Sequence, residues 1–205
     1  YMGNRNMCPE LKSYVELNFK PGKRDLYAAM MLRIVGLTCR SGRVAMVTQQ
    51  SWMFMTSFAD LRARGDDDNE RSHGSFRGLL RDTSLETIAH LGPNAFEEIS
   101  GEVVNTALFV LAVVEPSATH SLTARRLIAE PSANAKGDAL RSRRTESFRI
   151  RVSALLSIPR APIVYWVRPR FIDLISGPTR IGDRCVVTDG ASVADRMVRM
   201  VWEVP

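Results

Sequence analysis

The sequence of 205 residues has no long hydrophobic run and few aromatic residues, which make up 7% of the chain. No apolar stretch approaches the roughly 18 residues that a membrane-spanning helix needs, although 45% of the residues are hydrophobic. The first ten residues are polar and lack the apolar segment of a secretory signal. These absences exclude membrane-spanning and exported proteins and predict a soluble, cytoplasmic protein.

Cysteine and histidine are also scarce. The three cysteines, Cys8, Cys39 and Cys185, lie far apart and form no Cys-x-x-Cys pair. The three histidines lack metal-ligand spacing, and His90 lies in a predicted strand. We therefore expect reduced thiols, no bound metal, and structural or solvent-facing histidines.

Acidic residues are few in the later part of the chain. Residues 1–115 carry 13 Lys+Arg against 14 Asp+Glu, whereas residues 116–205 carry 15 against 8. A basic surface of this kind can neutralise DNA phosphates. Because 24 of the 28 basic residues are Arg, the codon bias of a GC-rich genome explains the excess equally well.

The first half of the chain shows helical and strand patterns in alternation. Apolar residues at spacings of three and four follow Asp25 and predict a helix from Leu26, capped by Asp25 and ended by Ser41-Gly42. The unbroken apolar run 44–48 predicts a parallel strand buried on both faces. Helical spacing resumes over 52–64, and the charged run 65–74 predicts a mobile surface insertion.

Two later stretches, 84–91 and 103–114, are rich in β-branched residues and predict antiparallel neighbouring strands at one edge of the sheet. The element order is that of an α/β fold.

Beyond residue 116 the periodicity weakens. We expect a strand over 124–128, a loop over 131–138, a basic segment over 141–151 and a short helix over 171–175. An aromatic, apolar segment spans 163–167, and residues 198–204 alternate like a strand. The predicted organisation is a first domain over 1–115, a basic connector over 116–170 and the beginning of a second domain over 171–205.

Three blocks, residues 25–29, 42–54 and 89–105, resemble adenine-specific DNA methyltransferases of BREX phage-exclusion systems, which have the gamma arrangement of amino-methyltransferases. The second and third blocks are long and nearly gapless, and looser similarity extends to 157–166 and 202–204. The resemblance implies the second half of a Rossmann-like methyltransferase sheet followed by the start of a target-recognition domain. Two departures are Cys39-Arg40-Ser41-Gly42, where relatives carry Lys-Pro-Gly-Gly, and a shortened stretch at 189–197.

The opening Tyr1-Met2-Gly3 resembles the end of the catalytic Asn-Pro-Pro-Tyr motif of that family. The resemblance implies that the motif's Asn and prolines, together with the loop that binds S-adenosylmethionine, lie upstream of Tyr1. The implied reaction transfers a methyl group from S-adenosylmethionine to adenine N6 in duplex DNA, as host marking in phage defence. The adenine must be flipped out of the helix to react. We expect the isolated chain to be inactive.

The family resemblance also implies roles for individual residues. Tyr1 and Phe96 would stack on the two faces of the flipped adenine, and Leu26 and Tyr27 would contact the cofactor. The residues themselves leave alternatives open: Phe96 can plug the core, and Leu26 and Tyr27 can belong to an apolar helix face.

The family resemblance also favours a contact between the basic segment and DNA. The arginines of this segment either bind DNA phosphates or solvate a connector. These are Arg141, Arg143, Arg144, Arg149 and Arg151. A different class of function also remains open, namely a non-catalytic DNA-binding or assembly module of a phage-defence complex.

Overall fold

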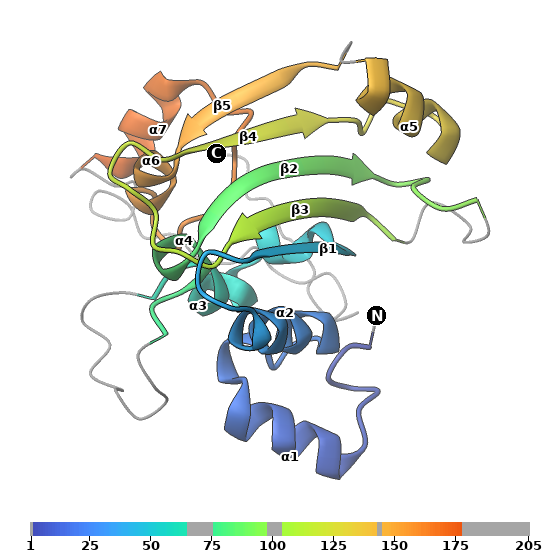
Figure 1. Cartoon of the computed structure of the whole chain (residues 1–205), viewed down its shortest axis with the longest axis vertical. Helices are drawn as coiled ribbons and strands as arrows, with labels where there is room; N and C mark the ends of the chain where they lie inside the picture. Colours follow the sequence, from blue (N-terminus) through green and yellow to red (C-terminus); the bar gives the residue numbers. More distant parts are fainter. Residues whose placement is uncertain (1, 65–75, 98–103, 143–144, 178–205) are drawn as a thin grey trace, which may run out of the picture.

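A computed structural model describes residues 2–64, 76–97, 104–142 and 145–177, and it shows a five-stranded sheet with helices around it (Figure 1). The helices are α1 (Pro9–Asn18), α2 (Leu26–Leu37), α3 (Ala59–Arg62), α4 (Leu79–Asp82), α5 (Ala133–Ser142), α6 (Val152–Leu156) and α7 (Pro169–Ser176). Short 3-10 turns are η1 (Lys20–Gly22), η2 (Gln50–Met53) and η3 (Thr56–Phe58). The strands are β1 (Arg43–Gln49), β2 (Ser84–Gly92), β3 (Thr106–Ala112), β4 (Ser121–Arg126) and β5 (Ser147–Arg151). The predicted α/β class is confirmed.

The sheet is mixed and has the strand order β1-β3-β2-β4-β5. Strand β3 is antiparallel to both β1 and β2, whereas β4 is parallel to β2 and β5 is antiparallel to β4. The predicted antiparallel pairing of 84–91 with 103–114 is therefore confirmed. The pair does not lie at an edge, however, because β4 and β5 extend the sheet beyond β2. Strands β1, β2 and β4 consequently end at the same edge of the sheet.

Strand β1 differs from its prediction. Val44 and Thr48 are buried, whereas Ala45 and Val47 are exposed. Among the described residues, β1 is an edge strand of the sheet. It pairs antiparallel with β3 and has only one face covered. An apolar run is therefore compatible with a half-covered strand, and the expected parallel strand buried on both faces is wrong.

Helix α2 begins as predicted, with Asp25 as its N-cap. The Asp25 carboxylate accepts a hydrogen bond from the Tyr27 amide at 3.3 Å, which satisfies one of the first free amides of the helix. Tyr27, Ala28 and Met31 are buried in the same core cluster as Val44 of β1. The cap and this apolar face together fix α2 against the sheet.

The segment predicted as one helix over 52–64 is instead divided into η2, η3 and α3. Trp52 is buried and its indole N–H donates to Thr48 Oγ1 at 2.9 Å. The guanidinium of Arg62 binds the carbonyl oxygens of Trp52 and Met55 at 2.7 and 2.9 Å. Because the Trp52 carbonyl bonds a side chain rather than the amide four residues later, a continuous helix does not form.

Arg62 also joins this segment to a turn 98 residues later. It is fully buried, and its remaining donors bind the carbonyls of Arg160 and Ala161, both of which have positive φ angles, 65° and 44°. Burial lowers the pKa of Arg62 to about 10, so the group stays charged at neutral pH. A buried charge is tolerated here because several carbonyl dipoles face it.

The segment 116–170, predicted as a connector, contributes β4 and β5 to the sheet. The loop expected over 131–138 is mostly α5, which is held by Lys136: its buried ammonium donates to the carbonyls of Leu127 and Glu130 at 2.8 and 2.6 Å. The helix expected over 171–175 is confirmed as α7. The domain boundaries at 115 and 170 stay predictions.

Within the described ranges, no helix is both long and apolar enough to cross a membrane. The expected insertion over 65–74, the shortened stretch 189–197 and the terminal strand over 198–204 lie outside the residues that the structure describes.

Candidate nucleobase site at the carboxyl edge of the sheet

A cavity of about 320 Å³ lies where β1 ends and β3 begins. Ligands of open α/β sheets characteristically bind at the carboxyl ends of the strands. Three carboxamide side chains, one hydroxyl, one aromatic ring and one thioether surround the space. These lining residues are Gln49, Gln50, Ser51, Phe54, Met55 and Asn105. The cavity therefore combines a surface for a flat ring with several hydrogen-bonding groups.

The segment that follows Tyr1 is anchored beside the start of α2. Met2 accepts a hydrogen bond from the Leu26 amide at 2.9 Å, Gly3 forms a β-bridge with Asp25, and Asn4 donates to the Arg24 carbonyl at 3.0 Å. In Figure 1 the described part of the chain begins on the side of the sheet where β1 and β2 end. Tyr1 itself is outside the described residues.

Leu26 and Tyr27, predicted to contact a cofactor, lie in different environments. Tyr27 is buried, its ring packs on Phe58 at 5.9 Å between centroids, and its hydroxyl bonds Ser51 Oγ at 2.8 Å. Tyr27 thus supports the cavity wall from behind and has little surface for a ligand. Leu26 is half-buried against a small cluster with Met7 and keeps some exposed surface.

Phe96 lies on the loop that follows β2, at the same edge of the sheet. Gly92 has a φ of +68°, which favours glycine, and the chain turns there away from the sheet. Ala95 packs inward, and Glu97 accepts a hydrogen bond from Asn134 of α5 at 2.9 Å. Phe96 is 40% exposed, so its ring does not plug the core and is accessible to a ligand.

A buried histidine connects the cavity to a segment 75 residues later. His90 is 3% exposed; its Nε2 contacts Oε1 of Gln50, and its Nδ1 lies 2.9 Å from the Tyr165 hydroxyl. Burial and the nearby charge of Arg126 lower the pKa of His90 to about 4, so the ring is neutral at pH 7. Since an amide oxygen only accepts, Nε2 carries the proton and Nδ1 accepts from Tyr165.

Aromatic rings enclose this histidine. Trp166 and Phe54 lie 6.0 Å from the His90 ring, and Tyr165 packs edge-on to Trp166 at 4.9 Å. Arg126, at the end of β4, stands 5.5 Å over the Trp166 ring. Burial raises the pKa of the Tyr165 hydroxyl well above its ordinary range, so the hydroxyl stays protonated at neutral pH.

The sequence indicated only part of this cluster, namely an aromatic segment over 163–167. Its pairing with His90, predicted merely as structural or solvent-facing, depends on contacts across 75 residues. No local pattern in β2 marks His90, because residues 88–92 are all buried and no alternation separates an inner from an outer face.

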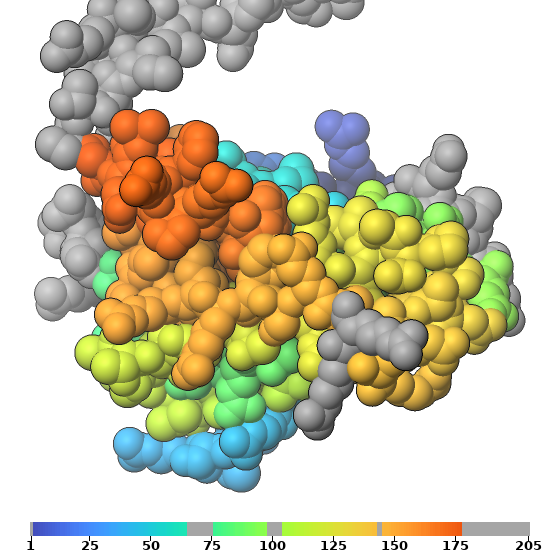
Figure 2. All heavy atoms as spheres, turned by 90° about the horizontal axis from the view of Figure 1, so that it is seen from above, coloured from blue at the N-terminus to red at the C-terminus, as the bar shows by residue number. Residues whose placement is uncertain are grey.

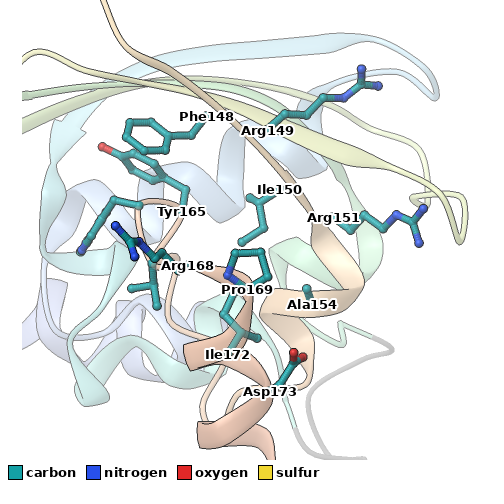
Figure 3. A pocket seen from close by; sticks show the side chains of 12 residues that line it. Phe148, Arg149, Ile150, Arg151, Ala154, Tyr165, Arg168, Pro169, Ile172 and Asp173 are labelled. Atoms are coloured by element: carbon teal, nitrogen blue, oxygen red, sulfur yellow. The ribbon is translucent and has the colours of Figure 1, made fainter.

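A second cavity of about 430 Å³ lies between β5, α6 and α7 (Figure 3). Ile150, Pro169 and Ile172 gather around it, whereas the Arg149 and Arg151 side chains point away from it. Both arginines are exposed on one face of β5, which lies between α5 and α7 when the molecule is seen from above (Figure 2).

Among the other arginines of the predicted DNA-contacting set, the described Arg141 does not join this pair. Arg141 is on α5, near the opposite end of β5 from Arg151, and pairs with Asp138 at 2.8 Å (Figure 1). Arg143 and Arg144 lie outside the described residues.

Comparison with solved structures gives weak similarity. A modification subunit of a putative type I restriction enzyme from Vibrio vulnificus YJ016 is 13% identical over 69% of this chain and 31% of its own, with a TM-score of 0.46. A DrdV–DNA complex is 14% identical over 78% of this chain and 16% of its own, with a TM-score of 0.49. No protein-family model matches the chain.

The chain is homologous to adenine-specific methyltransferases over most of its length. The relatives are PglX of Lacticaseibacillus casei (strain Zhang), 32% identical over 180 residues or 85% of this chain, and BrxX of Escherichia coli (strain HS), 32% identical over 187 residues or 91%. The predicted resemblance to the BREX methyltransferases is thereby confirmed. The chain spans 14% of the length of each relative.

Proposed function

We propose that this chain is one segment of a cytoplasmic DNA methyltransferase that transfers a methyl group from S-adenosylmethionine to adenine N6 in duplex DNA. The observation that carries the proposal is the 32% identity to two adenine-specific methyltransferases over 85% and 91% of the chain. Residues 1–115 would belong to the catalytic domain, 116–170 would extend its sheet through β4 and β5 and lead to the next domain, and 171–205 would begin the target-recognition domain.

The geometry at the carboxyl edge supports a base-binding role. The cavity there offers Phe54 for a flat ring and carboxamides for polar atoms, and both the segment after Tyr1 and the loop with Phe96 lie at this edge. Tyr1 and Phe96 would stack on the extruded adenine, with each stacking contact contributing about 1–3 kcal/mol.

The methyl donor would be held mainly by residues upstream of Tyr1. When bound, S-adenosylmethionine supplies the electrophilic methyl group. Leu26 keeps exposed surface and fits a contact with it, whereas the buried, hydrogen-bonded Tyr27 does not fit a direct contact and would shape the pocket from behind.

The decisive experiment restores the residues upstream of Tyr1 in frame and measures transfer of a labelled methyl group into duplex DNA. We expect transfer into adenine-containing duplexes and none into a duplex of only G and C. We expect the 205-residue chain alone to give no transfer. Absence of transfer by the restored protein would contradict the proposal, and tight S-adenosylmethionine binding by the 205-residue chain in calorimetry would contradict the upstream location of the donor site.

DNA binding by the basic surface is the second part of the proposal. Arg149 and Arg151 are exposed on one face of β5, where they can contact phosphates. Replacing both with Ala is expected to remove about two phosphate contacts. A salt-titrated gel shift measures this as a decrease of about two in the magnitude of the slope of log K against log salt concentration. The matched control replaces the exposed Arg33 of α2 and Arg40, which precedes β1 at the opposite edge of the sheet from β5. Equal slopes in the two double variants would contradict a role for β5, and DNA binding without transfer by the restored protein would favour an assembly module.

A further inference from the structure

We propose that Gln50 reads a ring nitrogen of the extruded adenine, and that His90 and Tyr165 hold the Gln50 carboxamide in the orientation that this contact requires. The inference rests on the proposed function and assigns a base-contacting residue and two positioning residues to it.

A glutamine carboxamide can take two orientations. Its terminal torsion is soft, and turning it by half a revolution exchanges an acceptor for two donors. Here Oε1 of Gln50 contacts Nε2 of His90, which carries the ring proton. The Nε2 amide group of Gln50 has no hydrogen-bond acceptor in the part of the chain that the structure describes, and Gln50 lines the cavity. The carboxamide therefore offers donors to a ligand there.

His90 and Tyr165 stabilise this orientation of Gln50. His90 can donate to Gln50 only while its proton stays on Nε2, and the Tyr165 hydroxyl at 2.9 Å occupies Nδ1. The Phe54 and Trp166 rings beside His90 leave it 3% exposed, so water does not compete for either nitrogen. Segment 161–166 thereby determines which group of Gln50 faces the cavity.

An adenine ring has acceptors that match the donors of Gln50. Adenine presents acceptor nitrogens on its ring, and glutamine is one of the two side chains that pair with its edge most readily. The N6 amine must stay free to receive the methyl group, so a ring nitrogen is the atom left for the Gln50 donors. Phe54, which lines the same cavity, provides an apolar wall for the flat purine.

The test uses the protein extended upstream of Tyr1 and duplexes in which the target adenine is replaced by 1-deaza-, 3-deaza- or 7-deazaadenine. In the wild type, one analogue is expected to slow methyl transfer at least about tenfold, the equivalent of 1.4 kcal/mol. Gln50→Ala is expected to slow transfer to adenine by a similar factor and to show no further loss with that analogue, because the two changes remove the same bond. Gln50→Glu, which keeps the size of the side chain, is expected to behave similarly.

The positioning residues are tested in the same way. His90→Phe and Tyr165→Phe are expected to lose most of the discrimination against the sensitive analogue. His120→Phe is the matched control: His120 lies at the opposite end of β4 and β2, where its Nε2 donates to the Leu85 carbonyl at 2.9 Å. That variant is expected to keep the wild-type discrimination.

The outcomes separate the two proposals. A wild-type protein that transfers no methyl group overturns the proposed function and this inference with it. Transfer combined with unchanged discrimination in Gln50→Ala overturns the inference alone. Nitrogen NMR of the 205-residue chain at pH 7 is expected to show His90 neutral with its proton on Nε2, and a proton on Nδ1 would overturn the proposed orientation whatever the activity.

Discussion

The two ends of the sheet contain similar residues that are used differently. At the carboxyl end, His90 bonds two side chains, Gln50 and Tyr165, and is enclosed by aromatic rings. At the opposite end, His120 bonds a backbone carbonyl, and Arg43 pairs with Glu86 on the surface. Side-chain partners orient one another, whereas a backbone or surface partner only supports a strand end. The carboxyl end is therefore the one organised to present polar groups to a ligand.

The largest effect on stability is expected for the buried Arg62, in contrast to the surface Arg43 at the start of β1. Arg62→Met leaves several buried carbonyls without a donor, and we expect a loss of at least about 3 kcal/mol of unfolding free energy in urea titrations. Arg43→Met is the control, because the Arg43 side chain is 65% exposed and its ion pair with Glu86 is solvated. It should leave the midpoint unchanged, and equal losses in the two variants would remove the contrast.

Acid should lower the free energy of unfolding through protonation of His90 at the carboxyl end of the sheet. The pKa of His90 is lowered from 6.5 to about 4 in the folded protein because of burial and the charge of Arg126. The unfolded chain binds a proton near pH 6.5, so the contribution of neutral His90 is complete above that pH and is lost as the pH falls toward 4. We expect a lower urea midpoint at pH 5 than at pH 7, with a smaller drop in His90→Phe. An equal drop in that variant would assign the effect to other groups.

A smaller effect is expected at Gly92, where the loop with Phe96 begins. Its φ of +68° and the Ile128 side chain, 3.0 Å from where a Cβ would lie, oppose any side chain. Gly92→Ala should cost about 1–2 kcal/mol. Gly36→Ala in α2, where a Cβ would meet nothing within 4 Å, should instead stabilise by roughly 0.5–1 kcal/mol. Thermal unfolding of the two variants measures both, and a shift of the same sign in each would contradict the explanation.

Local patterns predicted the elements that local interactions determine. The cap at Asp25, the helix after it and the antiparallel partners β2 and β3 follow from residue types at short spacing. Helix α5 was missed because its support is the buried Lys136, which binds carbonyls before the helix, and a lysine in a polar stretch normally indicates solvent. The broken helix over 52–64 was missed because its carbonyls bond the Arg62 side chain.

The candidate site was predictable only in part. Phe96 was chosen through the family resemblance and lies on the loop after β2, and its stacking role stays a prediction. Neither Gln50 nor His90 was predicted to act in the site. A glutamine that follows a strand and a histidine within a strand give no functional signal of their own. Their significance comes from Tyr165, which the fold brings from 75 residues away.

A single atom, Oδ1 of Asp25, receives both the Met2 amide and the Tyr27 amide at 3.3 Å. Displacement of the segment at Met2 would therefore move the first turn of α2. Tyr27 in that turn is hydrogen-bonded to Ser51, which lines the cavity. A movement of the backbone at Met2 would thus change the shape of the cavity without any hinge.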